Sequence, residues 1–254
     1  MTVIRSRDNP RVKRWAKLLQ DSSTRRREAS LVIEGPHLLS EALAAGIELR
    51  ALMVSESGLQ QREIADLVRG REPVVLGDGL FRNMSDADTP VGVAAEIGIP
   101  QTSPDGEKPV VFLEGVQDPG NVGAILRSAA AFGIGEVVLD RACADVWSPK
   151  VLRAGMGAHF KLALHSTPDL GRALEVFRGT TLCTVATKGE DLRQASLPGR
   201  LGWIFGAEGK GVSAATADRA RRRIAIPMAP GSESLNVAAA AAICLYEGFC
   251  RAVE

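Results

Sequence analysis

The chain lacks the sequence features of membrane, secreted and metal-binding proteins. Its longest apolar run, Val237 to Tyr246, falls well short of the ~20 residues that cross a bilayer. The first thirty residues hold no apolar core between charges, so we expect no signal peptide. The few cysteines form neither a CxxC pair nor a metal-like cluster: Cys143, Cys183, Cys244 and Cys250. These absences favour a reduced, cytoplasmic protein without a metal or a membrane partner.

The net charge of the chain is small, but the charged residues are unevenly distributed along it. The formal net charge is +1, which neither favours nor excludes a nucleic-acid partner. Residues 1–30 nevertheless carry nine Lys/Arg and three Asp/Glu, whereas residues 31–100 carry five and eleven. A basic block of this kind is most often a solvated face or a mobile arm, and it is also typical of segments that contact phosphates.

The first half of the chain alternates between short strands and helices. Of the 254 residues 45% are hydrophobic, which is ample for one large domain or two ordinary ones. A basic amphipathic helix over 9–20 opens this half. The stretch 101–109 breaks every periodicity and has the composition of a linker. We therefore predict a smaller N-terminal α/β domain at 1–100 and a second domain at 110–254.

The second half has the pattern of a parallel sheet covered by helices. Residues 110–113 form a continuous apolar run, which is typical of a strand buried on both faces. Asp118-Pro119 and Ser148-Pro149 each fit an N-cap followed by the first residue of a helix. Further strands are predicted at 137–139, 161–164, 181–186, 201–205 and 224–226. This alternation predicts an α/β fold with a mostly parallel sheet.

A glycine-rich loop, Gly206-Ala-Glu-Gly-Lys-Gly211, follows the strand predicted at 201–205. Such a loop lets backbone N–H groups approach a ligand closely, although a plain tight turn has the same composition. It is not a P-loop, because Lys210 is followed by Gly211 rather than by Ser or Thr. The stretch after strand 110–113 also lacks the GxGxxG of a Rossmann-type fold.

Two further blocks carry polar residues in apolar surroundings. The loop Ile226-Pro-Met-Ala-Pro-Gly-Ser-Glu-Ser-Leu-Asn236 leads into an Ala-rich helix, which we expect Ser234 to cap and begin. A capped helix alone does not explain Asn236 within that apolar helix. The predicted helix after Asp118 carries Asn121 and Arg127. Apolar neighbours flank Arg127, so we expect its guanidinium to emerge at an interface or at the edge of a site.

In order and separation, the blocks Asp118–Gly133, Ile204–Ser213 and Ile226–Val237 resemble the three motifs of the SpoU/TrmH family, RNA ribose 2'-O-methyltransferases of the SPOUT superfamily. The resemblance covers about residues 110–250. It implies S-adenosylmethionine as cofactor, a homodimer, and a deep trefoil knot made by the last helix. General folding rules make a knot improbable, so only the resemblance supports it.

The resemblance also implies roles for individual residues. It places the cofactor against Gly206, Ile226, Met228, Leu235 and Thr187. It implies a catalytic group of Arg127, Asn121, Glu208, Ser234 and Asn236. In that group Ser234 and Asn236 would fix the substrate ribose and a phosphate-side group, and Glu208 would help to shape the site.

The reaction needs a group that assists a ribose hydroxyl as it attacks the methyl carbon. Neither the first nor the third block offers an obvious base, and the resemblance implies that Arg127 is the activator. Because a guanidinium has a pKa above ~12, we interpret Arg127 as stabilising the developing alkoxide and binding the adjacent phosphate. The alternatives are His159, His37 and His165, for each of which a structural role is favoured.

The N-terminal segment resembles the RNA-binding substrate domain that many family members carry. Structured RNA is recognised mainly by shape and by phosphate contacts, which suits an arginine-rich helix. We expect RNA contacts from Arg11, Lys13, Arg25, Arg26 and Arg27. We also expect ribosomal RNA rather than transfer RNA as the substrate. The alternatives are a non-catalytic RNA-binding protein of the same fold, a tRNA-directed methylase and an antibiotic-resistance methylase.

Overall fold

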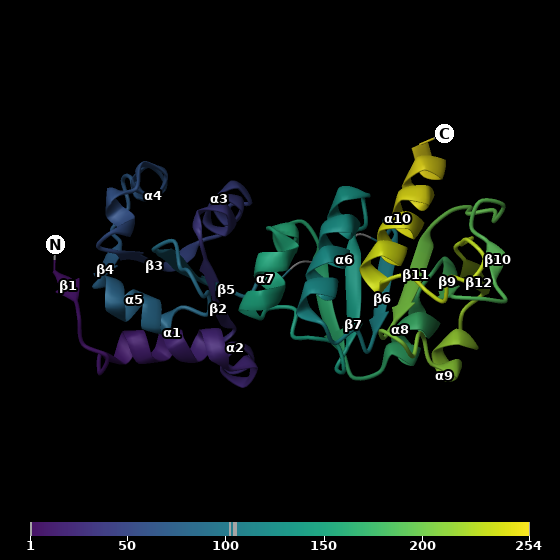
Figure 1. Cartoon of the computed structure of the whole chain (residues 1–254), viewed down its shortest axis with the longest axis horizontal. Helices are drawn as coiled ribbons and strands as arrows, with labels where there is room; N and C mark the ends of the chain where they lie inside the picture. Colours follow the sequence, from purple (N-terminus) through teal and green to yellow (C-terminus); the bar gives the residue numbers. More distant parts are fainter. Residues whose placement is uncertain (1, 102, 104–105, 254) are drawn as a thin grey trace. The chain divides into compact units, whose positions relative to one another are not determined.

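The computed structural model describes residues 2–101, 103 and 106–253, and α/β elements follow one another along this whole stretch (Figure 1). The linker predicted at 101–109 lies partly outside the described residues. No helix in the described part has both the length and the apolar character needed to cross a membrane.

The chain divides into two compact units, each with its own sheet. Unit 1 comprises Met1–Gln101 and Trp147–Phe160, and unit 2 comprises Thr102–Val146 and Lys161–Glu254. The sequence predicts that residues 110–254 form one domain, whereas the structure groups Trp147–Phe160 with the N-terminal part of the chain.

Unit 1 is built on a mixed five-stranded sheet. In sheet order its strands are β1 (Val3–Ile4), β4 (Val74–Leu76), β3 (Leu49–Ser55), β5 (Val93–Gly98) and β2 (Ser30–Glu34). Its helices are α1 (Pro10–Gln20), α2 (Ser22–Glu28), α3 (Pro36–Ala44), α4 (Arg62–Val68), α5 (Asp78–Met84) and α7 (Pro149–Gly155). Side chains alternate between the two faces of a strand, so Leu31 and Ile33 pack into one apolar core and Val32 into another.

Helix α7 belongs to unit 1 because its side chains complete the packing there. Leu152 is buried in the same apolar core as Leu31. Next to it, Arg153 forms an ion pair with Asp86, with Nη2 2.8 Å from Oδ2. The apolar content of residues 147–160 gives no hint of which unit they join, which is why the predicted boundary misses this segment.

A buried carboxylate, Glu96 on β5, joins three elements of unit 1. Arg14 donates to both of its oxygens, at 2.7 and 2.8 Å. Trp15 Nε1 donates at 2.9 Å and Ser30 Oγ at 2.8 Å. Burial alone would raise the pKa of Glu96, but these hydrogen bonds outweigh it and hold that pKa below its ordinary value.

One residue of the predicted RNA-binding set has a structural role instead. Arg25 is only 4% exposed. Its Nη1 donates to the carbonyl oxygens of Leu18 and Leu19, at 2.6 and 3.0 Å. These carbonyls belong to the last turn of α1, where backbone acceptors have no partner within the helix. The prediction that Arg25 contacts RNA is therefore wrong, whereas Arg26 and Arg27 on the same helix are exposed.

Unit 2 confirms the predicted α/β fold with a mostly parallel sheet. In sheet order its strands are β10 (Glu190–Asp191), β12 (Arg222–Ala225), β9 (Thr180–Val185), β11 (Leu201–Gly206), β6 (Val110–Glu114), β7 (Glu136–Asp140) and β8 (Ala163–Thr167), paired in parallel. Its helices are α6 (Pro119–Ala131), α8 (Leu170–Val176), α9 (Ala214–Ala217) and α10 (Val237–Val253). Every residue of β11 is buried, which places this strand at the centre of the core.

Helix α10 packs against α6 and against β11 (Figure 1). It does not begin where the sequence predicts. Its first residue is Val237, and Asn236 is the capping residue: Asn236 Oδ1 accepts hydrogen bonds from the backbone N–H groups of Ala238 and Ala239, at 2.9 and 3.2 Å. The prediction that Ser234 caps and begins this helix is wrong. In contrast, the caps predicted at Asp118 and Ser148 are both confirmed.

Replacing Glu96 with Gln should lower the free energy of unfolding by about 2 kcal/mol at neutral pH, since it weakens the pairing of a buried carboxylate with the partly exposed Arg14. The pKa of Glu96 is lowered by folding, so its contribution is present above the ordinary carboxyl pKa and is lost as pH falls through the folded value. Denaturant unfolding of both proteins between pH 7 and pH 3 measures this.

The matched control is Glu28→Gln, because Glu28 pairs with the same Arg14 at 2.7 Å but lies nearer the surface. We expect it to cost less than about 1 kcal/mol. A difference between wild type and Glu96→Gln that stays constant across this pH range would contradict the assigned role of the Glu96 charge.

Candidate active site

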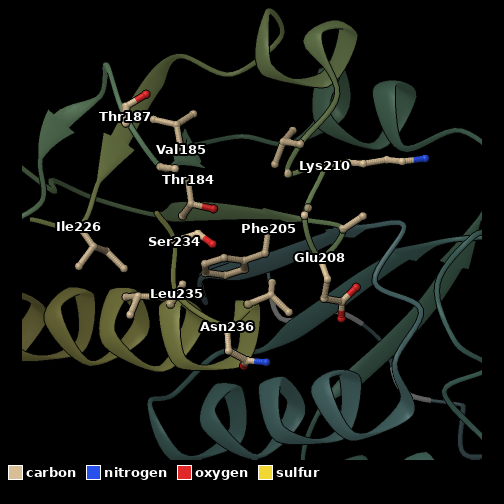
Figure 2. Close-up of a pocket in the computed structure, with 18 of the residues that line it drawn as sticks. Thr184, Val185, Thr187, Phe205, Glu208, Lys210, Ile226, Ser234, Leu235 and Asn236 are labelled. Atoms are coloured by element: carbon tan, nitrogen blue, oxygen red, sulfur yellow. The ribbon is translucent and has the colours of Figure 1, made fainter. Parts of the chain in front are cut away.

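A pocket of about 590 Å³ lies at the carboxyl ends of β9 and β11 in unit 2 (Figure 2). Most of its wall comes from three loops, at residues 184–187, 206–212 and 226–237. Neighbouring parallel strands end at the same edge of a sheet, so loops that are distant in sequence meet there. In open α/β sheets this edge is where ligands bind, and the volume suits a small organic molecule.

The two sides of the pocket differ in chemistry. Ile226, Leu235 and Ser234 lie toward one side, and Glu208 and Lys210 lie toward the other (Figure 2). Leu235 is 40% exposed, so its apolar side chain is accessible to a ligand in the pocket. Ile226 and Leu235 offer apolar surface, whereas Ser234, Glu208 and Lys210 offer polar and charged groups, a combination that suits a ligand with both an aromatic part and polar groups.

The loop from Gly206 to Gly211 is held by its own backbone. The N–H of Gly211 donates to the carbonyl of Ala207 at 2.8 Å, and the two residues form an isolated β-bridge. A Cβ atom on Gly206 would lie 2.1 Å from the carbonyl carbon of Gly211 and 2.2 Å from the backbone N of Val212. Gly206 is therefore required by the fold of the loop itself, before any ligand is considered.

A chain of hydrogen bonds connects the three sequence blocks. Asn236 Nδ2 donates to Asn121 Oδ1 at 3.0 Å, and Asn121 Nδ2 donates to Glu208 Oε1 at 2.7 Å. The cap of α10 fixes these orientations, because Asn236 Oδ1 already accepts from the helix and only Nδ2 remains for Asn121. The carboxylate of Glu208 is thereby held at the edge of the pocket.

Two family models match the chain. The model of the SpoU rRNA Methylase family matches residues 108–246, which is more than half of the chain, and the model of the MRM3-like substrate binding domain matches residues 9–95. The chain belongs to the SpoU rRNA methylase family. The family predicted from the three sequence blocks is therefore confirmed.

Relatives and solved structures of this SpoU methylase match most of the chain. The chain is 31% identical to the 23S rRNA (guanosine(2553)-2'-O)-methyltransferase RlmP of Bacillus subtilis, over 97% of this chain and 98% of that protein. It is 27% identical to the human mitochondrial rRNA methyltransferase 3, over 88% of this chain and 68% of that protein. The SpoU methyltransferase AviRb of Streptomyces viridochromogenes, solved in complex with AdoMet, is 26% identical, with a TM-score of 0.87 over 97% of this chain and 99% of that one.

The predicted enzyme class and cofactor are confirmed with the family: the protein is an RNA 2'-O-methyltransferase that uses S-adenosylmethionine. The pocket fits this cofactor on physical grounds. Ile226 and Leu235 offer apolar surface to the adenine ring, and the volume of about 590 Å³ is in the range of pockets that enclose small organic ligands.

The pocket brings together most of the site residues predicted from sequence. All five residues predicted to contact the cofactor line it: Gly206, Ile226, Met228, Leu235 and Thr187. Three of the predicted catalytic residues line it as well, namely Glu208, Ser234 and Asn236. Asn121 is joined to two of them by the hydrogen bonds above.

Arg127 and the three histidines lie elsewhere. Arg127 is exposed on α6 and is not among the residues that line the pocket. His159 is buried in unit 1 beside the ring of Trp147, and His37 Nε2 lies 3.3 Å from the carbonyl of Met156 in the same unit. His165 lies on β8, with Nε2 3.6 Å from Glu136.

Sequence reasoning missed the residues at the end of β9 and one cation. Thr184, Val185 and Ala186 line the pocket, and Thr184 Oγ1 donates to the carbonyl of Ile204 at 2.9 Å. The signal was available, because residues that follow a buried parallel strand lie at the ligand-binding edge. Lys210 also lines the pocket, although the sequence argument used it only to exclude a P-loop.

Replacing Leu235 with Ala should weaken S-adenosylmethionine binding roughly tenfold, because a leucine side chain contributes about 1.5–3 kcal/mol when a partner buries it. The melting temperature should stay unchanged, since Leu235 is partly exposed in the ligand-free protein. Calorimetric titration with the cofactor and a thermal melt measure both quantities.

Val176→Ala is the matched control, because Val176 is an exposed apolar residue of unit 2 that does not line the pocket. It should leave the cofactor affinity unchanged. Gly206→Ala, in contrast, should lower the melting temperature, because the added methyl group meets backbone. Wild-type affinity in Leu235→Ala would remove Leu235 from the cofactor site.

Proposed function

We propose that this protein methylates the 2'-hydroxyl of one ribose in structured ribosomal RNA. The observation that carries the proposal is the hydrogen-bonded chain of Asn236, Asn121 and Glu208 beside the pocket, because it unites all three sequence blocks at one place. Relatives that align with almost the whole chain are named for ribosomal RNA, which supports this substrate over transfer RNA.

When bound, S-adenosylmethionine supplies an electrophilic methyl carbon and a neutral thioether leaving group. The protein must hold the ribose hydroxyl in line with that carbon and exclude competing water. Ser234, whose side chain is exposed in the pocket wall, is placed to orient the ribose by a hydrogen bond. Glu208, fixed by Asn121, adds a hydrogen-bond acceptor at the same edge.

Arg127 is our candidate for the charged group of the chemical step. It is exposed on α6, the helix that also carries Asn121 and packs against α10. A guanidinium keeps its proton at neutral pH, so it acts as a donor that stabilises a developing alkoxide and binds the adjacent phosphate. As the O–CH3 bond forms and the S–CH3 bond breaks, the 2'-hydroxyl proton passes to a water molecule.

A non-catalytic RNA-binding protein of the same fold is disfavoured by the intact polar chain. Asn121, Glu208 and Asn236, to which the family resemblance assigns catalytic roles, are all present and joined by hydrogen bonds at the edge of the pocket. A tRNA-directed methylase and an antibiotic-resistance methylase share the chemistry and differ only in target. The identity of the methylated nucleotide separates them.

Unit 1 is our candidate for the RNA-binding part, as its match to a substrate-binding domain supports. Its exposed cations include Arg26 and Arg27 on α2 and Arg11 and Lys13 on α1. The guanidinium of Arg11 lies 5.0 Å from the ring centroid of Trp15, and Lys13 pairs with Asp8 at 2.7 Å. Such cations release counterions when they meet phosphates, so they add affinity without sequence preference.

We further propose that α10 threads an earlier loop and ties the deep knot that the family resemblance implies. The chain leaves β12 near one edge of the sheet and reaches α10, which packs on α6 and β11. To do so it passes beside β9 and the loop that follows β11, and both contribute to the same pocket as the start of α10.

A homodimer through α6 and α10 is supported by apolar side chains without cover. Ile243, Tyr246 and Phe249 on α10 are 41%, 55% and 41% exposed. The ring of Phe132, which follows α6, lies 5.6 Å from that of Tyr246 and 6.1 Å from that of Phe249. A cluster of this kind is typical of a surface that a partner covers.

Deleting the gene should remove one 2'-O-methyl group from ribosomal RNA, which mapping of 2'-O-methyl sites in total RNA detects. Wild-type protein should restore the group and Arg127→Ala should not, because we expect its single-turnover rate to fall about 10²–10⁴-fold. Arg221→Ala, which removes another exposed arginine of unit 2, is the control and should restore it.

The outcomes of this mapping are distinct. A lost methyl group in transfer RNA would correct the substrate class, and no lost methyl group would overturn the function. Full restoration by Arg127→Ala would remove Arg127 from the chemical step. Cofactor affinity should stay unchanged in Arg127→Ala, because Arg127 does not line the pocket.

The protein should sediment as a dimer at micromolar concentration, and the double variant Tyr246→Glu, Phe249→Glu should sediment as a monomer, because two buried charges oppose an apolar interface. Val176→Glu introduces a charge at an apolar residue that is 56% exposed on α8, and it should remain dimeric. A wild-type protein that is only monomeric under these conditions would refute the dimer.

A further inference from the structure

Lys210 is a cation at the pocket that no step described so far uses. Among the residues that line the pocket it is the only lysine or arginine, and Glu208 is the only acid. Its side chain is exposed. In the part of the chain that the structure describes, no hydrogen bond or ion pair to Lys210 is found. A pocket-lining ammonium group in this state is available for an anion that arrives from outside.

The loop that carries Lys210 is held by its own backbone. The bridge between Ala207 and Gly211 encloses Lys210, and the close backbone approach at Gly206 leaves the loop little freedom. Glu208, two residues away, is the nearest acid in sequence, but its Oε1 accepts from Asn121 at 2.7 Å. The carboxylate of Glu208 is therefore held by Asn121, whereas the ammonium group of Lys210 projects from the turn.

The direction of the side chain indicates which substrate it meets. Lys210 extends away from Ile226, Ser234 and Leu235, the side that we assign to the cofactor (Figure 2). The reactive sulfur of the cofactor is itself positively charged, so an ammonium group gains nothing by approaching it. The other substrate, RNA, brings a phosphate on each side of the ribose that is methylated.

We propose that Lys210 Nζ binds a backbone phosphate next to the target ribose and thereby sets the ribose 2'-oxygen over the cofactor. Lys210 is then a positioning residue, since it touches the RNA but not the reacting atoms. The proposal rests on the proposed RNA methylation, and it adds a second cation, separate from Arg127, to the contacts with the substrate.

The test uses the full-length protein and an unmodified transcript of 23S ribosomal RNA, the RNA for which the relative RlmP is named. Lys210→Ala should raise KM for this RNA roughly tenfold, as expected for the loss of one charge-assisted contact, with little change in kcat. The slope of log KM against log salt concentration should fall by about 0.7, the value for one phosphate contact on single-stranded nucleic acid. Lys210→Arg should recover most of the affinity.

Lys188→Asn is the matched control, because it removes one lysine from the loop after β9 without touching the pocket lining. Lys188 has φ of 59°, a conformation that asparagine tolerates, so the loop should keep its shape. We expect its KM and salt slope to equal those of the wild type.

Three results would overturn the proposal. An unchanged KM and salt slope in Lys210→Ala would leave Lys210 a solvated side chain. Weaker S-adenosylmethionine binding with an unchanged KM for RNA would assign Lys210 to the carboxylate of the cofactor instead. An equal effect in Lys188→Asn would make the effect one of net charge. Failure of the wild type to methylate the transcript would count against the proposed function itself, and is thus distinguishable.

Discussion

The unsatisfied backbone N–H groups at the start of α10 determine how the polar side chains beside the pocket are arranged. The first N–H groups of α10 have no partner within the helix, and Asn236 supplies one oxygen to two of them. That oxygen is then committed, so the amide N–H₂ of Asn236 turns to Asn121, and the amide of Asn121 turns to Glu208. One cap thus aligns three side chains that lie far apart in the sequence. These three side chains lie along one edge of the pocket.

The backbone of the loop after β11 requires a glycine at Gly206, whether or not a ligand is bound. The backbone of Gly211 and Val212 comes so close to Gly206 that no side chain fits between them. The same closeness holds the two charged residues of the loop at set places, one within the site and one at its rim. The backbone of this tight turn therefore helps to set the positions of Glu208 and Lys210.

Sequence patterns predicted the parallel sheet and the starts of two helices, since buried strands read as continuous apolar runs and Asp-Pro and Ser-Pro are strong caps. They failed where tertiary contacts decide. Ser234 and Asn236 are equally good caps by residue type, and the structure shows that Asn236 caps α10 while its amide N–H₂ donates to Asn121. In the run Arg25-Arg-Arg no apolar neighbour sets the phase of the helix, so the buried member cannot be told from the exposed ones. Residues 147–160 join unit 1 through α7 and its Leu152, which pack against β2, a strand more than a hundred residues earlier.

The membership of α7 in unit 1 has a consequence for how this protein can be taken apart. Residues Trp147–Phe160, which include α7, lie between β7 and β8 in the sequence. The chain therefore leaves unit 2 after Val146 and returns to it at Lys161. No single cut divides the molecule into two self-sufficient pieces. A chain trimmed to its last 145 or so residues would carry Leu152 without the leucines that bury it, and the first hundred residues alone would have a hole in their core. The two units are therefore interdependent, because neither can be replaced by the corresponding part of another protein unless α7 is replaced as well.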